Sequence, residues 1–294
     1  MKRWQEAEMP RYFGGGDMDR DFPKRSIRLK NNLRIACMEV ANGDYPVLWI
    51  HGMGSYRETF HPLFRNPPVP GRHVALDLPG FGHSSHLPRR HTLEDYAETV
   101  RDVVDELGLK KPILVGHSFG GMVVGETLAH FPDAIGGAIF VSSAGWFNPQ
   151  NAMVPTPYLW INRIGIWITG MDFFGRRMMA SLGVDPDMLT RDDRRRLRFG
   201  WRHAYEMARM GRFYESPDFS RRVQAAGVPI GVIHGDRDVL FPLDRLKEEL
   251  QDETPLWVID GAGHVPFYSR PDAFTRAFRS AFQLVAAGRN SGSR

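Results

Sequence analysis

The chain has 294 residues, of which 42% are hydrophobic and 24% charged, a balance typical of a globular protein with one or two well-buried domains. Its formal net charge of +4 comes without a nucleic-acid-binding motif, so nucleic acid is not an expected partner. No apolar stretch reaches the roughly 18 residues needed to cross a bilayer, so no membrane span is expected.

The first 25 residues are polar and irregular and are expected to form a loosely attached arm, 1–25. Its basic N-terminus is followed by acidic residues and Pro10 rather than by an apolar segment, which argues against a signal peptide. Residues 26–40 alternate around Asn31-Asn32, a pattern that predicts a β-hairpin. Cys37, the single cysteine, lies in this hairpin, so no intramolecular disulfide can form. A core-packing role and a reducing, cytoplasmic compartment are expected.

From residue 46 to residue 145, apolar runs typical of buried strands alternate with helical patterns. Thr92 followed by Asp95 is a capping box that predicts a helix start at Leu93. The alternation resumes at 228 and ends in a helix near 271–286, followed by a tail, 289–294, that is expected to be disordered. This order predicts a parallel sheet with helices on both faces. The expected elements are strands at 46–51, 72–77, 112–117 and 137–142 and helices near 57–65, 92–107 and 119–131.

A glycine-rich loop, His51-Gly52-Met53-Gly54, follows the strand at 46–51. Such a loop can bring a backbone N–H, here that of Met53, close to a nucleophile as a donor to an oxyanion. The alternative is an ordinary strand-to-helix turn that uses glycine for positive φ.

The sequence Gly116-His117-Ser118-Phe119-Gly120 lies between an apolar strand and a helical pattern. A sharp turn here would hold the Ser118 hydroxyl clear of the sheet, in a strained backbone conformation, where a base and a substrate can reach it. The amide of Phe119, at the start of the helix, can donate to a developing oxyanion. The pattern predicts a serine nucleophile, although chance matches to G-x-S-x-G are common.

Two later loops supply a candidate acid and a candidate base. The apolar run 228–233 leads into His234-Gly235-Asp236-Arg237-Asp238, and a carboxylate just past a strand lies on the functional edge of an open parallel sheet. Asp238 is the preferred acid and Asp236 the alternative, with Asp236 expected to cap the turn instead. His264 follows the last strand in a second glycine-rich loop, and it completes the chain order nucleophile, acid, base.

In these motifs the chain resembles the α/β-hydrolase-fold serine hydrolases over roughly residues 47–271. The resemblance implies an α/β class with the α/β-hydrolase fold: a mostly parallel central sheet, helices on both faces and an inserted helical cap. Ser269 stands where many relatives carry a glutamate, at a loop position that is not catalytic in the family. The matching motifs are H-G-x-G at 51–54, D-x-P-G-x-G-x-S at 77–84, G-x-S-x-G at 116–120, G-x-x-D-x-x-x-P at 235–242 and G-x-G-H-x-P at 261–266.

The resemblance places the cap at 146–224, inserted after the sixth strand between core segments 26–145 and 225–288. The pattern of this stretch is that of several helices without a strand. It carries four of the seven tryptophans and seven of the thirteen methionines, which suits a pocket for a bulky apolar ligand, with packing of cap on core as the alternative. It also carries thirteen arginines and no lysine. Several of these arginines cluster at 191–198. For this arginine cluster, a solvated helix face is favoured over an anion-binding site.

The expected function is a serine hydrolase that cleaves a carboxylic ester or lactone of a bulky apolar small molecule, with no metal or organic cofactor. Serine at position 118 excludes the aspartate nucleophile of the dehalogenases and epoxide hydrolases of this fold. Thioesterase, C–C hydrolase, amidase and cofactor-free perhydrolase activities stay as alternatives, as does a small-molecule receptor with slow turnover. The predicted substrate pocket consists of His51, Gly52, His117, Leu240 and Val265 in the core and Trp146, Phe147, Trp160, Trp167, Phe173, Phe174, Met178 and Met179 in the cap.

Overall fold

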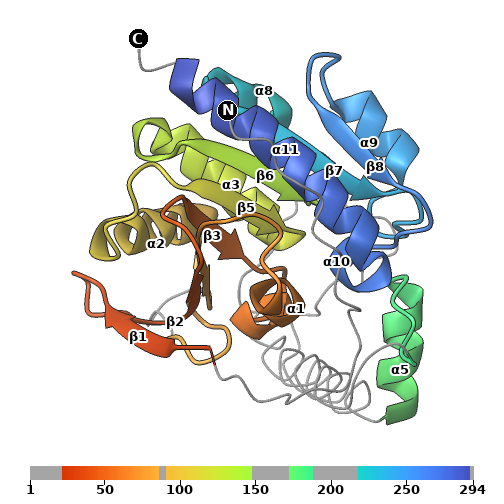
Figure 1. Cartoon of the computed structure of the whole chain (residues 1–294), viewed down its shortest axis with the longest axis horizontal. Helices are drawn as coiled ribbons and strands as arrows, with labels where there is room; N and C mark the ends of the chain where they lie inside the picture. The colour runs from red at the N-terminus through yellow and green to blue at the C-terminus, as the bar shows by residue number, and fades with distance from the viewer. Residues whose placement is uncertain (1–21, 86–90, 148–171, 188–217, 292–294) are drawn as a thin grey trace.

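The computed structural model describes residues 22–85, 91–147, 172–187 and 218–291. Eight strands form one sheet in the order β1-β2-β4-β3-β5-β6-β7-β8 (Figure 1). β2 is antiparallel to both of its neighbours, and every other pairing is parallel. The strands are β1 (Lys24–Arg28), β2 (Arg34–Ala41), β3 (Pro46–Ile50), β4 (Arg72–Leu76), β5 (Ile113–His117), β6 (Gly137–Val141), β7 (Ile230–Gly235) and β8 (Leu256–Ile259).

Two apolar layers, one on each face of the sheet, explain why the central strands are continuous apolar runs. In β3, Leu48 and Ile50 pack into one layer, whereas Val47 and Trp49 pack into the other. Successive strand side chains point to opposite faces, so a strand covered on both sides needs an apolar residue at every position. All five residues of β5 are buried, as this argument requires.

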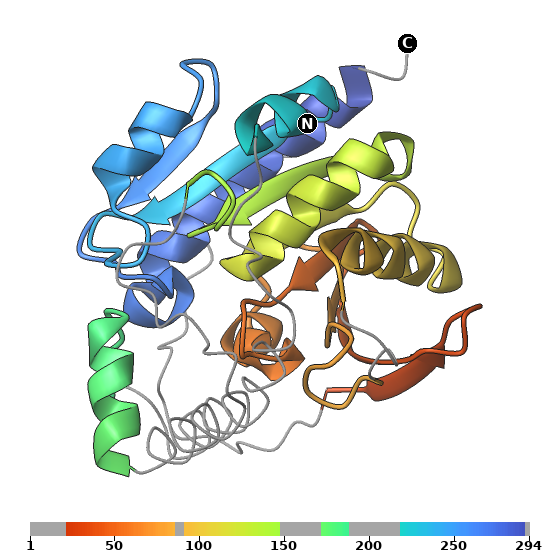
Figure 2. The same cartoon turned by 180° about the vertical axis from the view of Figure 1, so that it is seen from behind.

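Helices α2 (Leu93–Glu106), α3 (Phe119–His130) and α8 (Phe219–Ala225) cover one face of the sheet, which Figure 2 shows in front. Helices α1 (His61–Arg65), α10 (Pro266–Ser269) and α11 (Pro271–Ser291) cover the other. The other helices among the described residues are η1 (Arg57–Phe60), η2 (Pro132–Ala134), α5 (Asp172–Ser181) and α9 (Leu243–Glu249).

The predicted capping box is confirmed, since the amide of Asp95 donates to Thr92 Oγ1 and the amide of Thr92 donates to Asp95 Oδ2. The predicted hairpin is confirmed as β1 and β2, with Asn32 at a φ of 66° in the turn. The predicted mostly parallel sheet with helices on both faces is confirmed as well.

Both chain ends differ from the sequence predictions. The core begins before residue 26, because Phe22 is buried against His61 and β1 starts at Lys24, whereas residues 1–21 of the predicted arm lie outside the described residues. The last helix continues to Ser291, so the first three residues of the tail predicted to be disordered are helical. Local propensity does not predict this extension, because Gly288, Asn290 and Ser291 are poor helix formers. Gly288 instead packs against Pro229, where a Cβ would lie 2.8 Å from the proline ring, so tertiary contact continues α11 past the expected end near 286.

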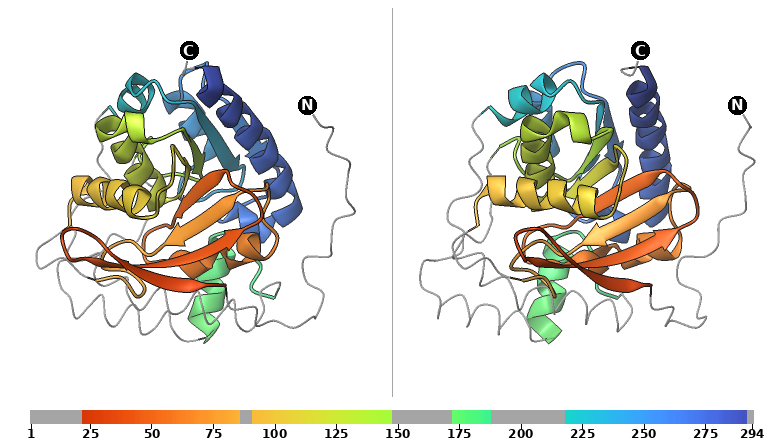
Figure 3. Two further views of the ribbon diagram at one scale, coloured as in Figure 1. Left: turned by 60° about the vertical axis from the view of Figure 1, so that its left-hand side comes forward. Right: turned by 90° about the vertical axis from the view of Figure 1, so that its left-hand side faces the viewer.

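The segment between β6 and β7 interrupts the alternation of strands and helices, as expected. Its described parts contain α5 and α8 and no strand. α5 lies at the end of the molecule away from the C-terminus (Figure 3). Most of the predicted cap, including Trp160 and Trp167, lies outside the described residues. Among the helices that the structure describes, none combines the length and the apolar composition that crossing a bilayer requires.

Candidate active site

Ser118 occupies a strained turn between β5 and α3. Its φ of 53° and ψ of −121° are unusual for a residue with a side chain, and such strain persists only where the surrounding structure enforces it. The flanking glycines explain how the turn is possible. A Cβ on Gly116 would lie 2.6 Å from the carbonyl oxygen of Gly120, and a Cβ on Gly120 would collide with the carbonyl oxygen of Ile50. Only glycine allows strand and helix to approach this closely.

Three side chains far apart in the sequence form one hydrogen-bonded series. Ser118 Oγ lies 2.9 Å from His264 Nε2, and His264 Nδ1 lies 2.8 Å from Asp238 Oδ2. His264 and Asp238 are buried, whereas Ser118 is partly exposed. The three residues come from the loops after β8, β7 and β5, whose carboxyl ends meet at one edge of the parallel sheet.

The Asp238 carboxylate uses both of its oxygens. Oδ2 faces His264, while Oδ1 accepts hydrogen bonds from the amides of Leu240 and Phe241. Asp238 therefore caps its own turn as well as contacting His264, which corrects the expectation that Asp236 would do the capping. One buried oxygen of Asp236 has no hydrogen-bond partner among the described residues. The preference for Asp238 as the partner of His264 agrees with this geometry.

Electrostatics favour an ionised Asp238. Burial by itself would raise the pKa of this carboxyl. The interaction and hydrogen bond with His264, supported by the hydrogen bond from the Phe241 amide, outweigh burial and hold the pKa of Asp238 below its usual value. A carboxylate at Nδ1 fixes the His264 tautomer with its proton on Nδ1, which leaves Nε2 as an acceptor facing the Ser118 hydroxyl.

The main chain of His264 is held on both sides. Its amide donates to the carbonyl oxygen of Leu182 at 2.9 Å, and its carbonyl oxygen accepts from His117 Nε2 at 2.9 Å. Leu182 follows α5, so the segment between β6 and β7 directly contacts the His264 loop. Gly183 and Gly263 touch at this point, since a Cβ on either would meet the Cα of the other at 2.5 Å.

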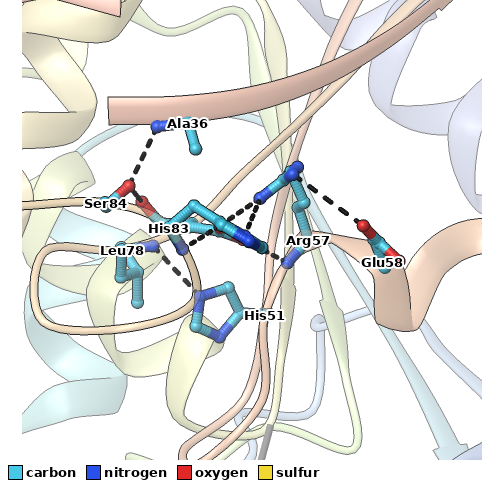
Figure 4. Close-up of polar contacts among 8 residues, drawn as sticks. Ala36, His51, Arg57, Glu58, Leu78, His83 and Ser84 are labelled. Atoms are coloured by element: carbon cyan, nitrogen blue, oxygen red, sulfur yellow. Dashed lines mark hydrogen bonds and ion pairs between the residues drawn. The ribbon is translucent and has the colours of Figure 1, made fainter. Parts of the chain in front are cut away.

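The loop after β3 is held by a group of polar residues around the buried Asp77, which we call the Asp77 cluster: Arg57, Asp77, His83 and Ser84 (Figure 4). Arg57 and Ser84 are buried as well, whereas His83 is exposed. Asp77 Oδ1 accepts from the Arg57 amide at 2.7 Å, and Asp77 Oδ2 accepts from the His83 amide at 2.8 Å and forms an ion pair with the Arg57 guanidinium. Both members of the ion pair are buried, so each offsets the desolvation of the other. The cluster joins η1 to the loop after β4.

His51 strengthens the same connection. Its Nδ1 donates to the carbonyl oxygen of Gly52 at 2.8 Å, and its Nε2 accepts from the Leu78 amide at 3.0 Å, so His51 is neutral with both nitrogens used (Figure 4). Burial lowers the pKa of His51 and favours this state. Together with the Asp77 cluster, His51 fixes the backbone of residues 51–57, which includes Met53.

Comparison with known proteins identifies the family and the fold. Residues 47–277, most of the chain, match the model of the alpha/beta hydrolase family. The chain belongs to the alpha/beta hydrolase family. A putative non-heme haloperoxidase of Mycobacterium phage D29 is 26% identical over 229 residues, which cover 74% of this chain and 80% of that protein.

Solved structures show the same fold. A putative aryl esterase from Burkholderia cenocepacia has a TM-score of 0.74 at 19% identity and covers 90% of this chain and 100% of its own. A bromoperoxidase from Bacillus anthracis has a TM-score of 0.68 at 17% identity, with coverages of 89% and 100%. The predicted resemblance to α/β-hydrolase-fold enzymes is thereby confirmed at the level of family and fold.

The pocket residues predicted for this alpha/beta hydrolase lie in different environments. Phe147 lies near the series of three side chains, because its ring contacts Phe241, whose ring in turn lies 5.6 Å from that of His264. Others are structural: His51 is fully buried with both nitrogens used, and Trp146 packs into the core between Phe140 and Phe219. Trp146 lies shortly after β6, and its ring packs on the face of the sheet that α8 covers.

The cap positions are less uniform than predicted. Phe173 of α5 is 67% exposed, and Met179 is buried in the layer that contains α10 and α11. Phe174 and Met178 lie on α5, and Trp160 and Trp167 fall outside the described residues. Gly52, Leu240 and Val265 lie in the loops around Ser118, Asp238 and His264, and Gly52 is close to the Cβ of Ser118.

One group of potential metal ligands is brought together by the fold. Atoms of Glu94, Glu126 and His130 lie within 4.8 Å of one another on α2 and α3. Glu126 already accepts from His130 Nε2 at 2.9 Å and from Arg222 Nη2 at 3.0 Å. A guanidinium therefore neutralises the one buried carboxylate of the group.

Sequence reasoning did not foresee three contacts of the site: that of the Leu182 carbonyl with the His264 amide, that of His234 with Asp238, and that of Arg57 with Asp77. The motif at 77–84 was recognised, but not its partner Arg57. A signal for His234 was present, because strands β3, β5 and β7 all end in or beside a histidine followed by glycine or serine. No local pattern marks Leu182, since its role depends on where the inserted segment returns to the core.

Proposed function

We propose that this protein is a serine hydrolase that cleaves a carboxylic ester or lactone through an acyl-enzyme. The observation that carries the proposal is the series Ser118–His264–Asp238, presented on a strained turn at the carboxyl edge of the sheet. The two short distances, the partial exposure of Ser118 and the burial of the other two residues are the features that nucleophilic acyl transfer needs.

The chemistry follows from the tautomer of His264. Its Nε2 removes the proton from Ser118 Oγ as that oxygen attacks the substrate carbonyl, and Asp238 stabilises the imidazolium that forms. The imidazolium then gives the same proton to the leaving alkoxide as the tetrahedral intermediate collapses to the acyl-enzyme. Water, activated by the same nitrogen, releases the carboxylic acid and restores Ser118.

The developing oxyanion is assigned to the backbone amides of Met53 and Phe119. Phe119 follows Ser118 at the N-terminus of α3, where the helix dipole favours negative charge. Met53 lies in the loop that His51 and the Asp77 cluster hold. Removing one such donor raises the barrier by about 3–4 kcal/mol in comparable enzymes.

A bulky apolar acyl group is the proposed substrate class. Phe241 and Phe147 place aromatic surface beside His264, and the segment between β6 and β7 supplies more tryptophan and methionine. Each methylene that the ligand buries contributes about 0.8 kcal/mol. We expect kcat/KM for p-nitrophenyl esters to rise with acyl length from acetate until the pocket is full. A steady fall from acetate onward would contradict this assignment.

Perhydrolysis is a second candidate activity, because one relative is named a haloperoxidase and one structural neighbour a bromoperoxidase, and both names refer to reactions that use peroxide. In that reaction hydrogen peroxide replaces water in attacking the acyl-enzyme and leaves as the peracid. Assays of one ester with and without peroxide separate the two outcomes.

The decisive experiment labels the nucleophile. A fluorophosphonate should modify Ser118, identified by peptide mapping, and Ser118→Ala should lose both labelling and ester hydrolysis while keeping its fold. Modification of another serine, or unchanged hydrolysis by Ser118→Ala, would overturn the proposal. If each protein molecule cleaves only one ester molecule and stays labelled, the protein is instead a receptor with slow turnover.

A further inference from the structure

Two buried histidines outside the proposed triad make matching contacts with the loops that carry it. His117 ends β5 and His234 lies in β7, on strands that both border β6. Each uses Nε2 to donate to a backbone carbonyl oxygen. Each also has a buried Nδ1 without a hydrogen-bond partner among the described residues.

His117 contacts the loop of the base. Its Nε2 donates to the carbonyl oxygen of His264 at 2.9 Å, and the two imidazole rings lie 5.1 Å apart. The ring of Phe267 packs edge-on against His117 at 5.2 Å. The His117 ring is thus confined between the turn that carries Ser118 and the loop that carries His264.

His234 contacts the loop of the acid. Its Nε2 donates to the carbonyl oxygen of Phe241 at 2.7 Å and lies 3.8 Å from Asp238 Oδ2. The amide of the same Phe241 donates to Asp238 Oδ1. His234 therefore holds the residue that in turn orients the Asp238 carboxylate.

We propose that His117 and His234 are positioning residues that hold the His264 and Asp238 loops in register through neutral Nε2–H donors. This inference rests on the proposed function. The two residues act through the main chain of His264 and of Phe241, to whose carbonyl oxygens their Nε2 atoms donate.

The neutral state of the two rings is part of the assignment. A second cation at 3.8 Å from Asp238 would compete with His264 for that carboxylate, and a cation at His117 would oppose formation of the His264 imidazolium. Burial lowers the pKa of both rings, that of His117 to about 3. Neutral donors can therefore fix the loops without adding charge beside the proton-transfer path.

The test pairs two amide substitutions at each position. Glutamine reaches about as far as Nε2 and keeps a donor there, whereas asparagine reaches only as far as Nδ1 and withdraws it. A loop displacement of about 1 Å can cost roughly 100-fold in rate. We expect His117→Asn and His234→Asn to lower kcat for an ester by about 10- to 100-fold with little change in KM. The Gln variants should retain most of kcat.

His73 provides the matched control. It is buried on β4 and donates from Nε2 to the carbonyl oxygen of Val69 at 2.9 Å, a bond of the same kind that involves no triad loop. His73→Asn should lower the melting temperature without lowering kcat. If kcat instead follows the melting temperature across all three positions, or if Asn and Gln behave alike at 117 and 234, the positioning role is wrong.

A measurement on the wild-type protein tests the proposal even if some variants fail to fold. ¹⁵N-histidine NMR should show His117 and His234 as neutral Nε2–H tautomers and His264 with its proton on Nδ1. An Nδ1–H tautomer at His117 or His234 would overturn the inference. This measurement does not depend on activity. Correct tautomers in a protein whose Ser118→Ala variant loses no hydrolysis would therefore refute the proposed function and leave the loop contacts standing.

Discussion

The loops on the two sides of Ser118 are held by different chemistry. On the oxyanion side, a buried ion pair between Arg57 and Asp77 fixes the loop after β3. On the acid–base side, the neutral donors of His117 and His234 fix the loops after β8 and β7. Both devices join segments distant in the sequence, but only the first places opposite formal charges in the interior.

The difference follows from what each side must do. The pKa of a proton-transfer group is sensitive to every charge nearby. Because the groups that support His264 and Asp238 are neutral, the pKa values of these two residues are set mainly by their interaction with each other. Backbone amides carry no titratable charge. The loop that contains Met53 can therefore be anchored by an ion pair whose members also satisfy the Arg57 and His83 amides.

The largest effect is expected from removing the charge of Asp238, the buried carboxylate that contacts His264. Asp238→Asn should lower kcat by about 10⁴-fold, the magnitude known for loss of the triad carboxylate in serine proteases, because His264 loses the partner that fixes its tautomer. Asp236→Asn is the matched control and should retain nearly full activity. Steady-state kinetics on both variants decide the point, and the reverse ranking would assign the acid to Asp236.

The next effect concerns stability on the oxyanion side. Asp77→Asn leaves the buried Arg57 guanidinium with only the weaker contact to Glu58 Oε1 at 3.8 Å, and it should reduce the free energy of unfolding by about 3 kcal/mol. Glu39→Gln, which removes the shared partner of the more exposed Arg25 and Arg72, should cost at most about 2 kcal/mol. Urea denaturation of both variants provides the comparison. A larger loss for Glu39→Gln would show that the Asp77 cluster is not the support described here.

Local patterns predicted much of this arrangement. The turn at Ser118 follows from two glycines and an apolar strand, and the positions of Asp238 and His264 follow from strands that end at one edge. Trp146 was misplaced because its ring direction depends on α8, which is remote in sequence. The contact of Leu182 with His264 and the dual use of Asp238 depend on loop geometry that no residue pattern specifies.

The dependence of stability on pH should be similar for the positioning residue His117 and for the control residue His73, because it reports mainly burial of the ring. Burial lowers the pKa of His117 to about 3 and that of His73 to about 4, against 6.5 in an unfolded chain. The unfolded state therefore binds more protons below pH 6.5. Stability is complete above that pH and declines as the pH falls, by up to roughly 1.4 kcal/mol per pH unit for each ring.

His117→Gln and His73→Gln should therefore each make the free energy of unfolding less steep between pH 6.5 and about pH 4. Urea denaturation across that range measures the slope. An unchanged slope in either variant would mean that the replaced ring is protonated in the folded protein. The two variants should look alike in this assay even though only position 117 contacts a triad loop.

The smallest expected effect uses Cys37 as a local probe. Burial, and next the Asp77 carboxylate, raise the pKa of this thiol to about 12, so the native protein holds almost no thiolate at neutral pH and alkylation requires opening of β2. Cys37 pairs with Leu76 in the ladder just before Asp77. Asp77→Asn should therefore speed alkylation by iodoacetamide under native conditions, followed by mass spectrometry, whereas His117→Asn should leave the rate unchanged. Equal acceleration of alkylation in both variants would mean that the loop after β3 and the loops after β7 and β8 unfold together. The different chemistry that holds them would then not make them independent.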